Sequence, residues 1–326
     1  MTGDTRSRAV GIDLGGTNIK GGLVDRDGRV AVKKSIPTEA AGGAGHVIDR
    51  IASLVADLID KGGAGPDDVA GVCVGSPGPL DADRGIIFEA PNLGWRDVPL
   101  ADELTARLDF PVWLENDANA AAFGEAWVGA GKGRECVILL TLGTGIGGGI
   151  VIGGRLWRGV NGTGAELGHM TIDYDGPVCG CGSRGCIEAF AAAPALVRRM
   201  RRAIEDGADS SLAGAFRAGE EVDAKRIFEA AVAGDGPARR EMEQTGRFLG
   251  IAIASYVNIF NPNCVVLHGG MVDAGDMLLG PLVDEMAGRC FESSRRGLQV
   301  LRSALRGEAG MVGAAGCAFA EAEGST

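Results

Sequence analysis

One arrangement constrains the fold of this chain more than any other: a buried strand, a glycine-rich turn and a second strand occur in that order twice. The first copy reads DLGGT over residues 13–17 and follows a strand expected from Arg8 to Asp13. The second reads TLGTG over residues 141–145 and ends the apolar run that starts at Cys136. Two halves that open alike predict two related α/β lobes. Chance similarity is the alternative, because 55 of the 326 residues are glycine.

Periodicity and turn residues place the other elements. Apolar side chains at helical spacing predict a helix over 46–61, which Gly62 and Gly63 end. Residues 143–149 are expected to form one glycine-rich turn before a strand at 150–152. Further helices are expected at 100–108, 118–128 and 309–322, with 194–250 mainly helical. Further strands are expected at 19–25, 29–36, 69–74, 112–115, 136–142 and 265–268.

The glycine turns also restrict how a phosphate group can bind. The P-loop pattern fails, because GKG at residues 131–133 has glycine where serine or threonine is required. Gly143, Gly145 and Gly148 match the dinucleotide pattern G-x-G-x-x-G, but a strand follows them instead of the helix that a pyrophosphate requires. The third interpretation is that both hairpin turns bind one polyphosphate through backbone N–H groups. A plain hairpin is the alternative for each turn taken alone.

This interpretation predicts a set of nucleotide-binding residues. Threonine hydroxyls beside the glycines would add hydrogen-bond donors, and Asp13 at the end of the first strand would hold Mg²⁺ through water. Gly269-Gly270, after a further strand, would lie flat under an adenine ring. The predicted residues are Asp13, Gly15, Gly16, Thr17, Asn18, Gly143, Thr144, Gly145, Gly269 and Gly270.

A cluster of sulfur and nitrogen ligands lies further along the chain. His169 is followed ten residues later by Cys179, and then by Cys181 and Cys186. Three thiolates and one imidazole complete the tetrahedral set of a structural zinc, which keeps no open position for activating water. In a chain expected to be cytoplasmic, such a cluster favours metal over disulfides. The alternative is a set of free thiols beside a surface histidine.

Acidic side chains near these motifs are typical of a site for a polyhydroxylated ligand. Glu166 and Glu188 flank the cluster, so zinc would hold both carboxylates as acceptors for sugar hydroxyls. Asn116-Asp117 lies between a strand and a helix, where an aspartate commonly caps the helix. Asp117 is also placed to act as general base toward a hydroxyl that attacks a γ-phosphoryl group, with Asn116 binding ring hydroxyls.

Net charge and hydropathy exclude several classes of partner. The formal net charge is −11 and no cluster of lysine and arginine offsets it, which argues against nucleic acid or an anionic membrane. No apolar run approaches the roughly 18 residues that span a bilayer, and the N-terminal sequence lacks the apolar region of a secretory signal. We therefore expect a cytoplasmic protein whose polar head, residues 1–8, is a disordered tail.

At these motifs the sequence resembles the ROK family of sugar kinases and repressors, and most of all its bacterial glucokinase branch. The matching segments are DLGGT at 13–17, ENDANA at 115–120, residues 141–149, ELGH at 166–169, and the run from Cys179 to Glu188. Each segment is unspecific by itself, but the combination is highly specific. It extends over most of the chain from residue 13 to residue 188, with Gly269-Gly270 beyond.

The resemblance implies an actin/hexokinase-like α/β fold, in which two RNase-H-like lobes close over a cleft. Residues 1–117 and a C-terminal helix near 306–326 would form a small lobe for nucleotide and sugar. Residues 118–305 would form a large lobe with the zinc site and a dimer surface. It implies Asp117 as the catalytic base. The sugar contacts that it implies are Ser76, Gly78, Asn92, Asn116, Asp117, Glu166, His169 and Glu188.

The activity implied by the resemblance is ATP-dependent phosphorylation of glucose at its 6-hydroxyl, in a homodimer or homotetramer that uses Mg²⁺ for catalysis and Zn²⁺ for structure. A kinase for N-acetylmannosamine, N-acetylglucosamine or fructose is the main alternative, because those kinases share these motifs. Polyphosphate is a less expected donor, since that branch usually lacks the cysteines. A sugar-responsive repressor is expected least, because a helix-turn-helix has no room before Gly15 and the chain is acidic.

Overall fold

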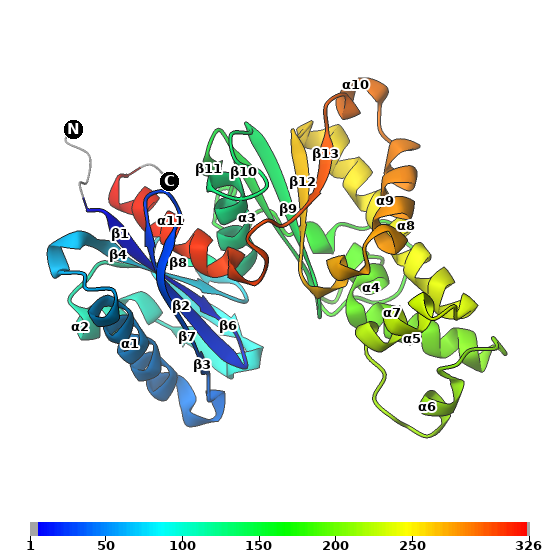
Figure 1. Ribbon diagram of the computed structural model, residues 1–326, viewed down its shortest axis with the longest axis horizontal. Helices are drawn as coiled ribbons and strands as arrows, with labels where there is room; N and C mark the ends of the chain where they lie inside the picture. The colour runs from blue at the N-terminus through cyan, green and yellow to red at the C-terminus, as the bar shows by residue number, and fades with distance from the viewer. Residues whose placement is uncertain (1–5, 325–326) are drawn as a thin grey trace. The chain divides into compact units, whose positions relative to one another are not determined.

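The computed structural model describes residues 6–324, which form two compact units (Figure 1). Unit 1 comprises the N-terminal residues up to Leu139, the segment Gly149–Ala165 and the C-terminal residues from Ser303. Unit 2 comprises Leu140–Gly148 and Glu166–Arg302. Within the described part of the chain, no helix has both the length and the apolar composition that crossing a bilayer requires.

Unit 1 is built on a five-stranded sheet with the strand order β3-β2-β1-β4-β8. The first three strands along the chain are antiparallel neighbours, whereas the last two run parallel to β1. The strands are β1 (Arg8–Leu14), β2 (Asn18–Asp25), β3 (Val30–Pro37), β4 (Val69–Ser76) and β8 (Val112–Asn116). A smaller antiparallel sheet follows β4 and consists of β5 (Leu80–Asp81), β6 (Ile86–Ala90) and β7 (Trp95–Val98).

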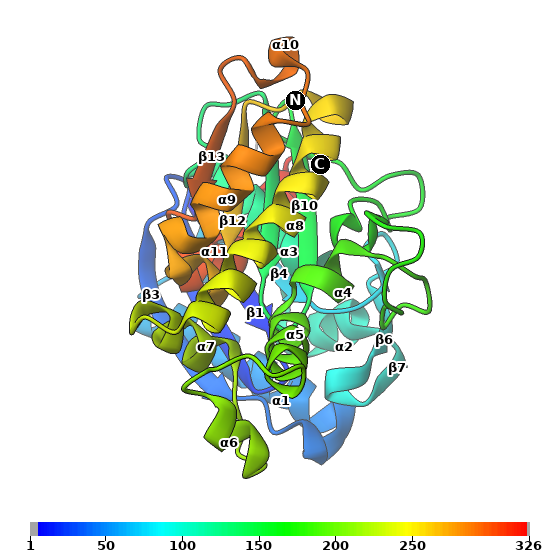
Figure 2. The same ribbon diagram turned by 90° about the vertical axis from the view of Figure 1, so that its right-hand side faces the viewer.

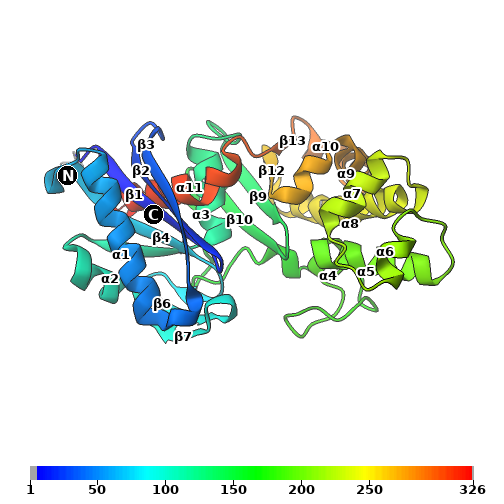
Figure 3. The same ribbon diagram turned by 60° about the horizontal axis from the view of Figure 1, so that its bottom comes forward.

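Two helices cover opposite faces of the five-stranded sheet (Figure 3). α1 (Gly43–Lys61) packs its apolar stripe on one face, where a Cβ at Gly21 would lie 2.8 Å from the Leu58 side chain. α11 (Ala309–Ala322) packs on the other face, where a Cβ at Gly11 would lie 1.9 Å from a backbone oxygen of that helix. Gly21 pairs with Ile12, the residue next to Gly11. Because successive strand residues point to opposite faces, Gly11 and Gly21 lie on opposite faces of the sheet. The glycine on the α11 face therefore lets the helix backbone approach the strand.

α2 (Leu100–Leu108) and α3 (Asp117–Trp127) complete the helices of unit 1. α3 packs on α11 so closely that a Cβ at Gly313 would lie 1.7 Å from the carbonyl oxygen of Ala120. The buried carboxylate of Glu125 accepts the N–H of Leu305 at 2.9 Å and the hydroxyl of Ser303 at 2.5 Å. These contacts place α3 and the segment from residue 303 in unit 1, so the compact units do not follow the boundaries expected at 117 and 305.

The second five-stranded sheet has the order β11-β10-β9-β12-β13, and its strands β9 and β10 are divided between the units. Its strands are β9 (Cys136–Leu142), β10 (Ile146–Ile152), β11 (Arg155–Leu156), β12 (Cys264–His268) and β13 (Gln299–Arg302). The helices of unit 2 are α4 (Ile187–Ala191), α5 (Ala193–Glu205), α6 (Ala213–Arg217), α7 (Ala224–Val232), α8 (Gly236–Phe260), α9 (Asp276–Ala287) and α10 (Glu292–Arg295). α8 and α9 lie side by side (Figure 2), because Gly246 lets the α9 backbone approach.

The predicted bounds of α2, β9 and α11 are confirmed, but the second glycine-rich segment needs correction. β10 begins at Ile146, so Gly147–Gly149 lie in a strand and only residues 143–145 remain as the turn. Close packing explains two of these strand glycines, Gly148 and Gly149. A Cβ at Gly148 would lie 2.7 Å from the Leu167 side chain, and one at Gly149 would lie 2.5 Å from Ala122. The glycines therefore serve helix and loop packing rather than a long phosphate-binding loop.

The N-terminal prediction is wrong for the last residue of the expected tail. Arg8 begins β1, and its guanidinium donates a hydrogen bond of 2.6 Å to the carbonyl of Gly62. The backbone N–H of Ser7 also donates to Asp68 at 3.1 Å. Residues 1–5 of the expected tail lie outside the described residues. The sequence also missed β5–β7, β13, α9 and α10, most of which are short.

Candidate active site

The carboxyl ends of three parallel strands meet at one edge of the unit 1 sheet. In the strand register Asp13 pairs with Gly75, and Ser76 at the end of β4 pairs with Asn116 at the end of β8. A Cβ at Gly75 would lie 3.7 Å from the Cα of Asp117. The sheet therefore brings together predicted residues that come from distant parts of the sequence, as expected for an open α/β sheet.

Asp117 lies in the first turn of α3, and its neighbour Asn116 caps the helix. The side-chain oxygen of Asn116 accepts the backbone N–H of Ala118 at 2.9 Å and that of Asn119 at 3.2 Å. Asp117 is half-buried, and its carboxylate accepts the N–H of Ala118 at 2.8 Å. The cap expected of an aspartate is thus provided mainly by the asparagine. A carboxylate in the first helical turn interacts favourably with the helix dipole.

The first glycine turn lies at the same edge as Asp13. The N–H of Gly15 donates to the Asn18 carbonyl at 3.0 Å, and the Thr38 hydroxyl donates to the Gly15 carbonyl at 2.6 Å. A Cβ at Gly16 would lie 3.1 Å from the Cβ of Asn92, so the predicted sugar residue Asn92 lies directly against the turn. The turn is therefore held by side chains of unit 1 on both sides.

Two further predicted residues follow β4. Ser76 is fully buried and donates to the carbonyl of Pro77 at 3.3 Å. Gly78 has a φ of +87°, and a Cβ there would lie 2.2 Å from the carbonyl oxygen of Glu89. Only glycine fits this backbone conformation and this approach of β6. Ser76 and Gly78 thus shape the loop beside Asn116, and the structure gives Ser76 a buried position.

The second glycine turn, at residues 143–145, belongs to unit 2. The N–H of Gly143 donates to the Gly145 carbonyl at 3.0 Å, and the N–H of Ala193 at the start of α5 donates to the Gly143 carbonyl at 2.9 Å. Gly269 has a φ of +105°, and a Cβ there would lie 2.4 Å from the Leu142 carbonyl oxygen. The sequence-distant Gly269-Gly270 therefore lies beside the second turn, as the nucleotide interpretation requires.

A cavity of about 500 Å³ opens next to these glycines within unit 2. Gly143, Thr144 and Gly270 line it together with side chains that the sequence did not single out. The apolar members of its wall include Leu196, Phe228, Met242 and Met271, and the charged members include Asp223, Lys225, Glu229 and Asp273. Apolar walls with a few polar groups and a volume of several hundred cubic ångströms are typical of a small-molecule site.

The cysteine and histidine cluster is assembled in unit 2 as the sequence predicts. The possible ligand atoms of His169, Cys179, Cys181 and Cys186 all lie within 4.8 Å of one another. The Cys179 sulfur lies 3.6 Å from Nδ1 of His169, and the Cys181 and Cys186 sulfurs are 3.7 Å apart. A tetrahedral zinc with metal–sulfur bonds of about 2.3 Å places its ligand atoms at about these separations. The donor set and its spacing therefore fit zinc.

Burial makes the thiols of this cluster unequal. Burial raises the pKa of the Cys179 thiol to about 12 and also raises the pKa of Cys186. A hydrogen bond from the Ser183 backbone holds the pKa of the exposed Cys181 below its usual value. A metal cation would favour the thiolate form of all three cysteines, because it supplies the positive charge that these thiolates lack.

Glu188 connects the cluster to the second glycine turn. Its Oε2 accepts the N–H of Ile146, the residue after the turn, at 2.9 Å, and its Oε1 lies 3.5 Å from the Cys179 sulfur. Glu166 is 64% exposed, and its Oε2 lies 4.0 Å from Nε2 of His169. The histidine thus presents Nδ1 to a cysteine and Nε2 to Glu166. Turn, metal ligands and both predicted sugar carboxylates form one connected group in unit 2.

Family comparison identifies the chain. Residues 9–321 match the sequence model of the ROK family. The chain belongs to the ROK family. This ROK protein is 41% identical over 309 residues to the glucokinase of Thermotoga maritima, which covers 94% of this chain and 96% of the relative.

Solved structures agree with the family. The ROK hexokinase from Thermus thermophilus aligns with a TM-score of 0.80 at 38% identity, covering 96% of this chain and 98% of the other. The ROK family glucokinase from Streptomyces griseus, solved in complex with glucose and AMPPNP, aligns with a TM-score of 0.79 at 37% identity over 95% and 98% of the two chains. The predicted family and the predicted actin/hexokinase-like fold are confirmed.

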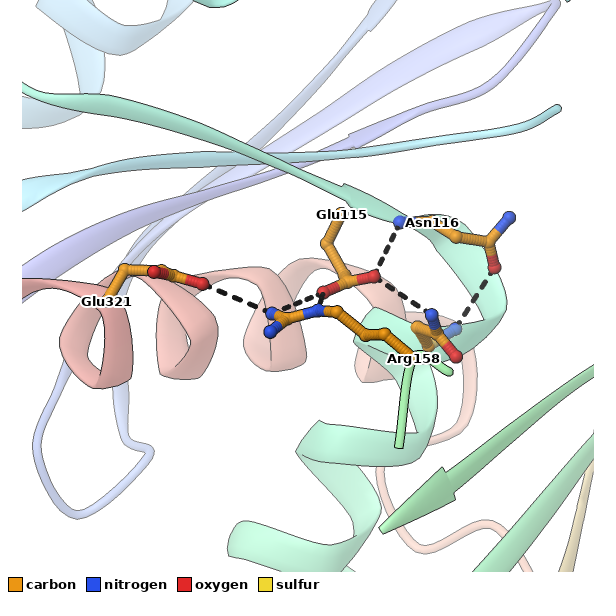
Figure 4. A network of polar contacts seen from close by, with 5 residues as sticks. Glu115, Asn116, Arg158 and Glu321 are labelled. Carbon is orange, nitrogen blue, oxygen red and sulfur yellow. Dashed lines mark hydrogen bonds and ion pairs between the residues drawn. The ribbon is translucent and has the colours of Figure 1, made fainter. Parts of the chain in front are cut away.

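The sequence reasoning missed the ion-pair network of Glu115, Arg158 and Glu321 in this ROK protein (Figure 4). Glu115, the residue two before Asp117, is 2% exposed and lies 2.7 Å from the Arg158 guanidinium. Arg158 also lies 3.2 Å from Glu321 of α11. The available signal was the glutamate itself, because an acidic residue in a strand that is otherwise buried requires a partner. Nothing in the sequence pointed to Arg158 as that partner.

Proposed function

We propose that this chain transfers the γ-phosphoryl group of ATP to the 6-hydroxyl of glucose. Support comes from its likeness to the Thermotoga maritima glucokinase and to the Streptomyces griseus structure that holds glucose and AMPPNP. The observation that carries the proposal is the position of Asp117. It follows the cap residue Asn116 in the first turn of α3, at the edge where β1, β4 and β8 end.

In the proposed reaction Asp117 acts as the general base. The 6-hydroxyl oxygen attacks the γ-phosphorus, the bond from that phosphorus to the bridging oxygen of ADP breaks, and the hydroxyl proton passes to the Asp117 carboxylate. Asn116 binds a ring hydroxyl through its amide. Glu166, His169 and Glu188 accept or donate hydrogen bonds to further hydroxyls, because ionised carboxylates and imidazoles suit polyhydroxylated ligands.

The cavity in unit 2 is proposed as the adenosine site. Its apolar wall suits a purine ring, and Gly270 has no atom within 4 Å of the position where a Cβ would stand. Backbone N–H groups of the two glycine turns would face phosphate oxygens. Mg²⁺ would neutralise phosphate charge, and Asp13 is the residue that would hold it through water.

Zinc is proposed as a structural ion held by His169, Cys179, Cys181 and Cys186. All four positions of a tetrahedral metal would be filled by protein, so the ion would hold in place the segment that carries Glu166 and the start of α4, which carries Glu188. Three thiols in a metal set rather than in disulfides support the proposed cytoplasmic location. The family resemblance supports a homodimer or homotetramer, which a light-scattering mass in solution would test.

The proposal is tested by ADP release with ATP and a panel of sugars. Glucose should be phosphorylated far faster than N-acetylmannosamine, N-acetylglucosamine and fructose, and phosphorus NMR should show glucose 6-phosphate. Activity with N-acetylmannosamine and not with glucose would contradict the proposed substrate but still support a sugar kinase. No ADP release with any sugar, from protein that contains one zinc per chain, would contradict the proposed function.

A further inference from the structure

The junction of β8 and α3, just before Asp117, depends on the buried carboxylate of Glu115. Its Oε1 accepts the backbone N–H of Asn116 at 3.0 Å and the side-chain amide of Asn119 at 2.9 Å. These two bonds join the end of strand β8 to the first turn of helix α3. Asp117 lies between the two residues that Glu115 holds, so the position of its carboxylate depends on them.

Arg158 is the cation that compensates the charge of the buried Glu115 carboxylate. Its Nε donates to Oε2 of Glu115 at 2.7 Å, and its Nη2 lies 2.7 Å from the same oxygen. Burial opposes the charge of Arg158, but the charge and hydrogen bond of Glu115, together with other nearby groups that include Glu321, raise the pKa of the guanidinium. A buried carboxylate without such a partner is strongly destabilised.

The backbone of Arg158 is itself held at both sides. The N–H of the preceding residue, Trp157, donates to the carbonyl of Ile150 in β10 at 2.8 Å. The carbonyl of Arg158 accepts the N–H of Gly164 at 2.8 Å, and its guanidinium reaches Glu321 at 3.2 Å. Residues 157 and 158 are therefore anchored to a strand, a loop and α11 within unit 1, and the Arg158 guanidinium lies between Glu115 and Glu321 (Figure 4).

The side chain of Asn119 shows how strongly Glu115 orders its surroundings. The amide nitrogen of Asn119 faces Glu115, while its buried Oδ1 has no hydrogen-bond partner within residues 6–324. Turning the amide over would direct its oxygen at the carboxylate. The unsatisfied oxygen thus accompanies the bond to Glu115, and leaving it without a partner opposes folding.

We propose that Arg158 is a positioning residue, which acts through Glu115 to hold Asn116 and Asp117 in the geometry that phosphoryl transfer needs. The inference rests on the proposed function, because that function makes Asp117 the base. The cavity proposed for adenosine is lined by residues of unit 2, and Arg158 is not among them. Its removal should therefore affect turnover more than nucleotide affinity.

The test compares Arg158→Met, Arg158→Lys and the control Arg107→Met in the zinc-loaded full chain. Arg107 is a matched control, because it lies in unit 1 and also pairs with two carboxylates, Asp49 and Glu103. Arg158→Met should lower kcat about 10–100-fold, with KM for ATP changing less than about twofold. Arg158→Lys should recover part of kcat, because it keeps the charge but loses the planar fork. Arg107→Met should keep the wild-type kcat.

Hydrogen exchange gives a readout that needs no activity. The backbone amide of Asn116, which donates to Glu115, should exchange about tenfold faster or more in Arg158→Met, while amides in the centre of β1 stay protected. A folded Arg158→Met protein with wild-type kcat and wild-type exchange at Asn116 would overturn the inference. So would a general loss of protection across unit 1, accompanied by equal changes in kcat and KM for ATP.

A second variant keeps the inference testable if Arg158→Met does not fold. Glu115→Gln combined with Arg158→Met removes both charges, so no carboxylate is buried without a partner. This double variant should fold and turn over slowly, and wild-type kcat in it would overturn the inference. If the wild-type chain phosphorylates no sugar, the proposed function fails. Exchange at Asn116 then still tests whether Arg158 orders the junction of β8 and α3.

Discussion

In unit 1 the turn at residues 15–17 is held by the Thr38 hydroxyl and packs against Asn92, whereas in unit 2 the turn at residues 143–145 is held by α5 and lies beside Glu188. Both turns follow a buried strand and read almost alike. The first lies at the strand edge that carries Asp13 and Asp117. The second opens on an apolar cavity and is joined through Glu188 to Cys179 of the proposed metal cluster. The same local motif therefore takes its chemistry from its neighbours.

Replacing the base gives the largest expected effect and tests whether unit 1 carries the acid–base chemistry. Asp117→Asn should lower kcat by about 10³-fold or more, because the amide cannot take the hydroxyl proton. The free energy of unfolding should change little, since an asparagine oxygen can still accept the Ala118 N–H. Steady-state kinetics and urea unfolding measure the two effects. Asp67→Asn, at an exposed position, serves as control. If Asp117→Asn keeps kcat within tenfold of wild type, Asp117 is not the general base.

Breaking the metal cluster should affect unit 2 in a different way. Cys181→Ala should lose zinc and raise Kd for the sugar about tenfold or more, because the segments that carry Glu166 and Glu188 are no longer held by the metal. Metal analysis and isothermal titration with glucose measure both changes in the same sample. Cys290→Ala, a half-buried thiol outside the cluster, is the control. Sugar affinity that survives complete loss of zinc would separate the metal from the sugar site.

Adding a methyl group to each turn compares the two turns directly. A Cβ at Gly145 would lie 2.7 Å from Oε2 of Glu188, whereas one at Gly16 would lie 3.1 Å from Asn92. Gly145→Ala should therefore displace Glu188 and destabilise the protein by about 1–3 kcal/mol, with a smaller cost for Gly16→Ala. Thermal unfolding and KM for the sugar measure the difference. Gly214→Ala, where no atom lies within 4 Å, is the control, and equal costs at both turns would contradict the comparison.

The smallest expected effect concerns the scaffold of unit 2 away from both turns. Asp235 caps α8 and is partly buried, which opposes its charge, but bonds from Ala238, Ser211 and Ser210 lower its pKa below 3.8. Its stabilisation is therefore present above pH 3.8 and is lost as pH falls through the lower folded-state pKa.

Asp235→Ala should cost about 1 kcal/mol at pH 7 and progressively less in acid. Urea unfolding between pH 7 and pH 3 checks this, with the exposed Asp206→Ala as control. A cost that stays constant down to pH 3 would show that the charge of Asp235 does not matter.

The sequence predicted most of the local structure because periodicity and turn residues are local signals. α2, β9 and α11 have the bounds that their apolar spacing indicates. Short elements such as β5 and α10 carry too few residues for a period to be visible. The glycines at 147–149 lie in β10 instead of the expected turn. Gly148 and Gly149 admit Leu167 and Ala122, which no local pattern reveals.

The chain by itself determined the ligand types: three cysteines and a histidine at zinc spacing, acids beside them, and an asparagine-aspartate pair at a helix start. Those are chemical properties of side chains, and they do not depend on the fold. Only the tertiary structure decided which of them meet. The strand register puts Asp13, Ser76 and Asn116 at one edge, and Arg158 pairs with Glu115 across 43 positions of sequence. Such pairings arise from packing between distant segments. A buried carboxylate requires a cationic partner, but the tertiary structure determines which cation lies beside it.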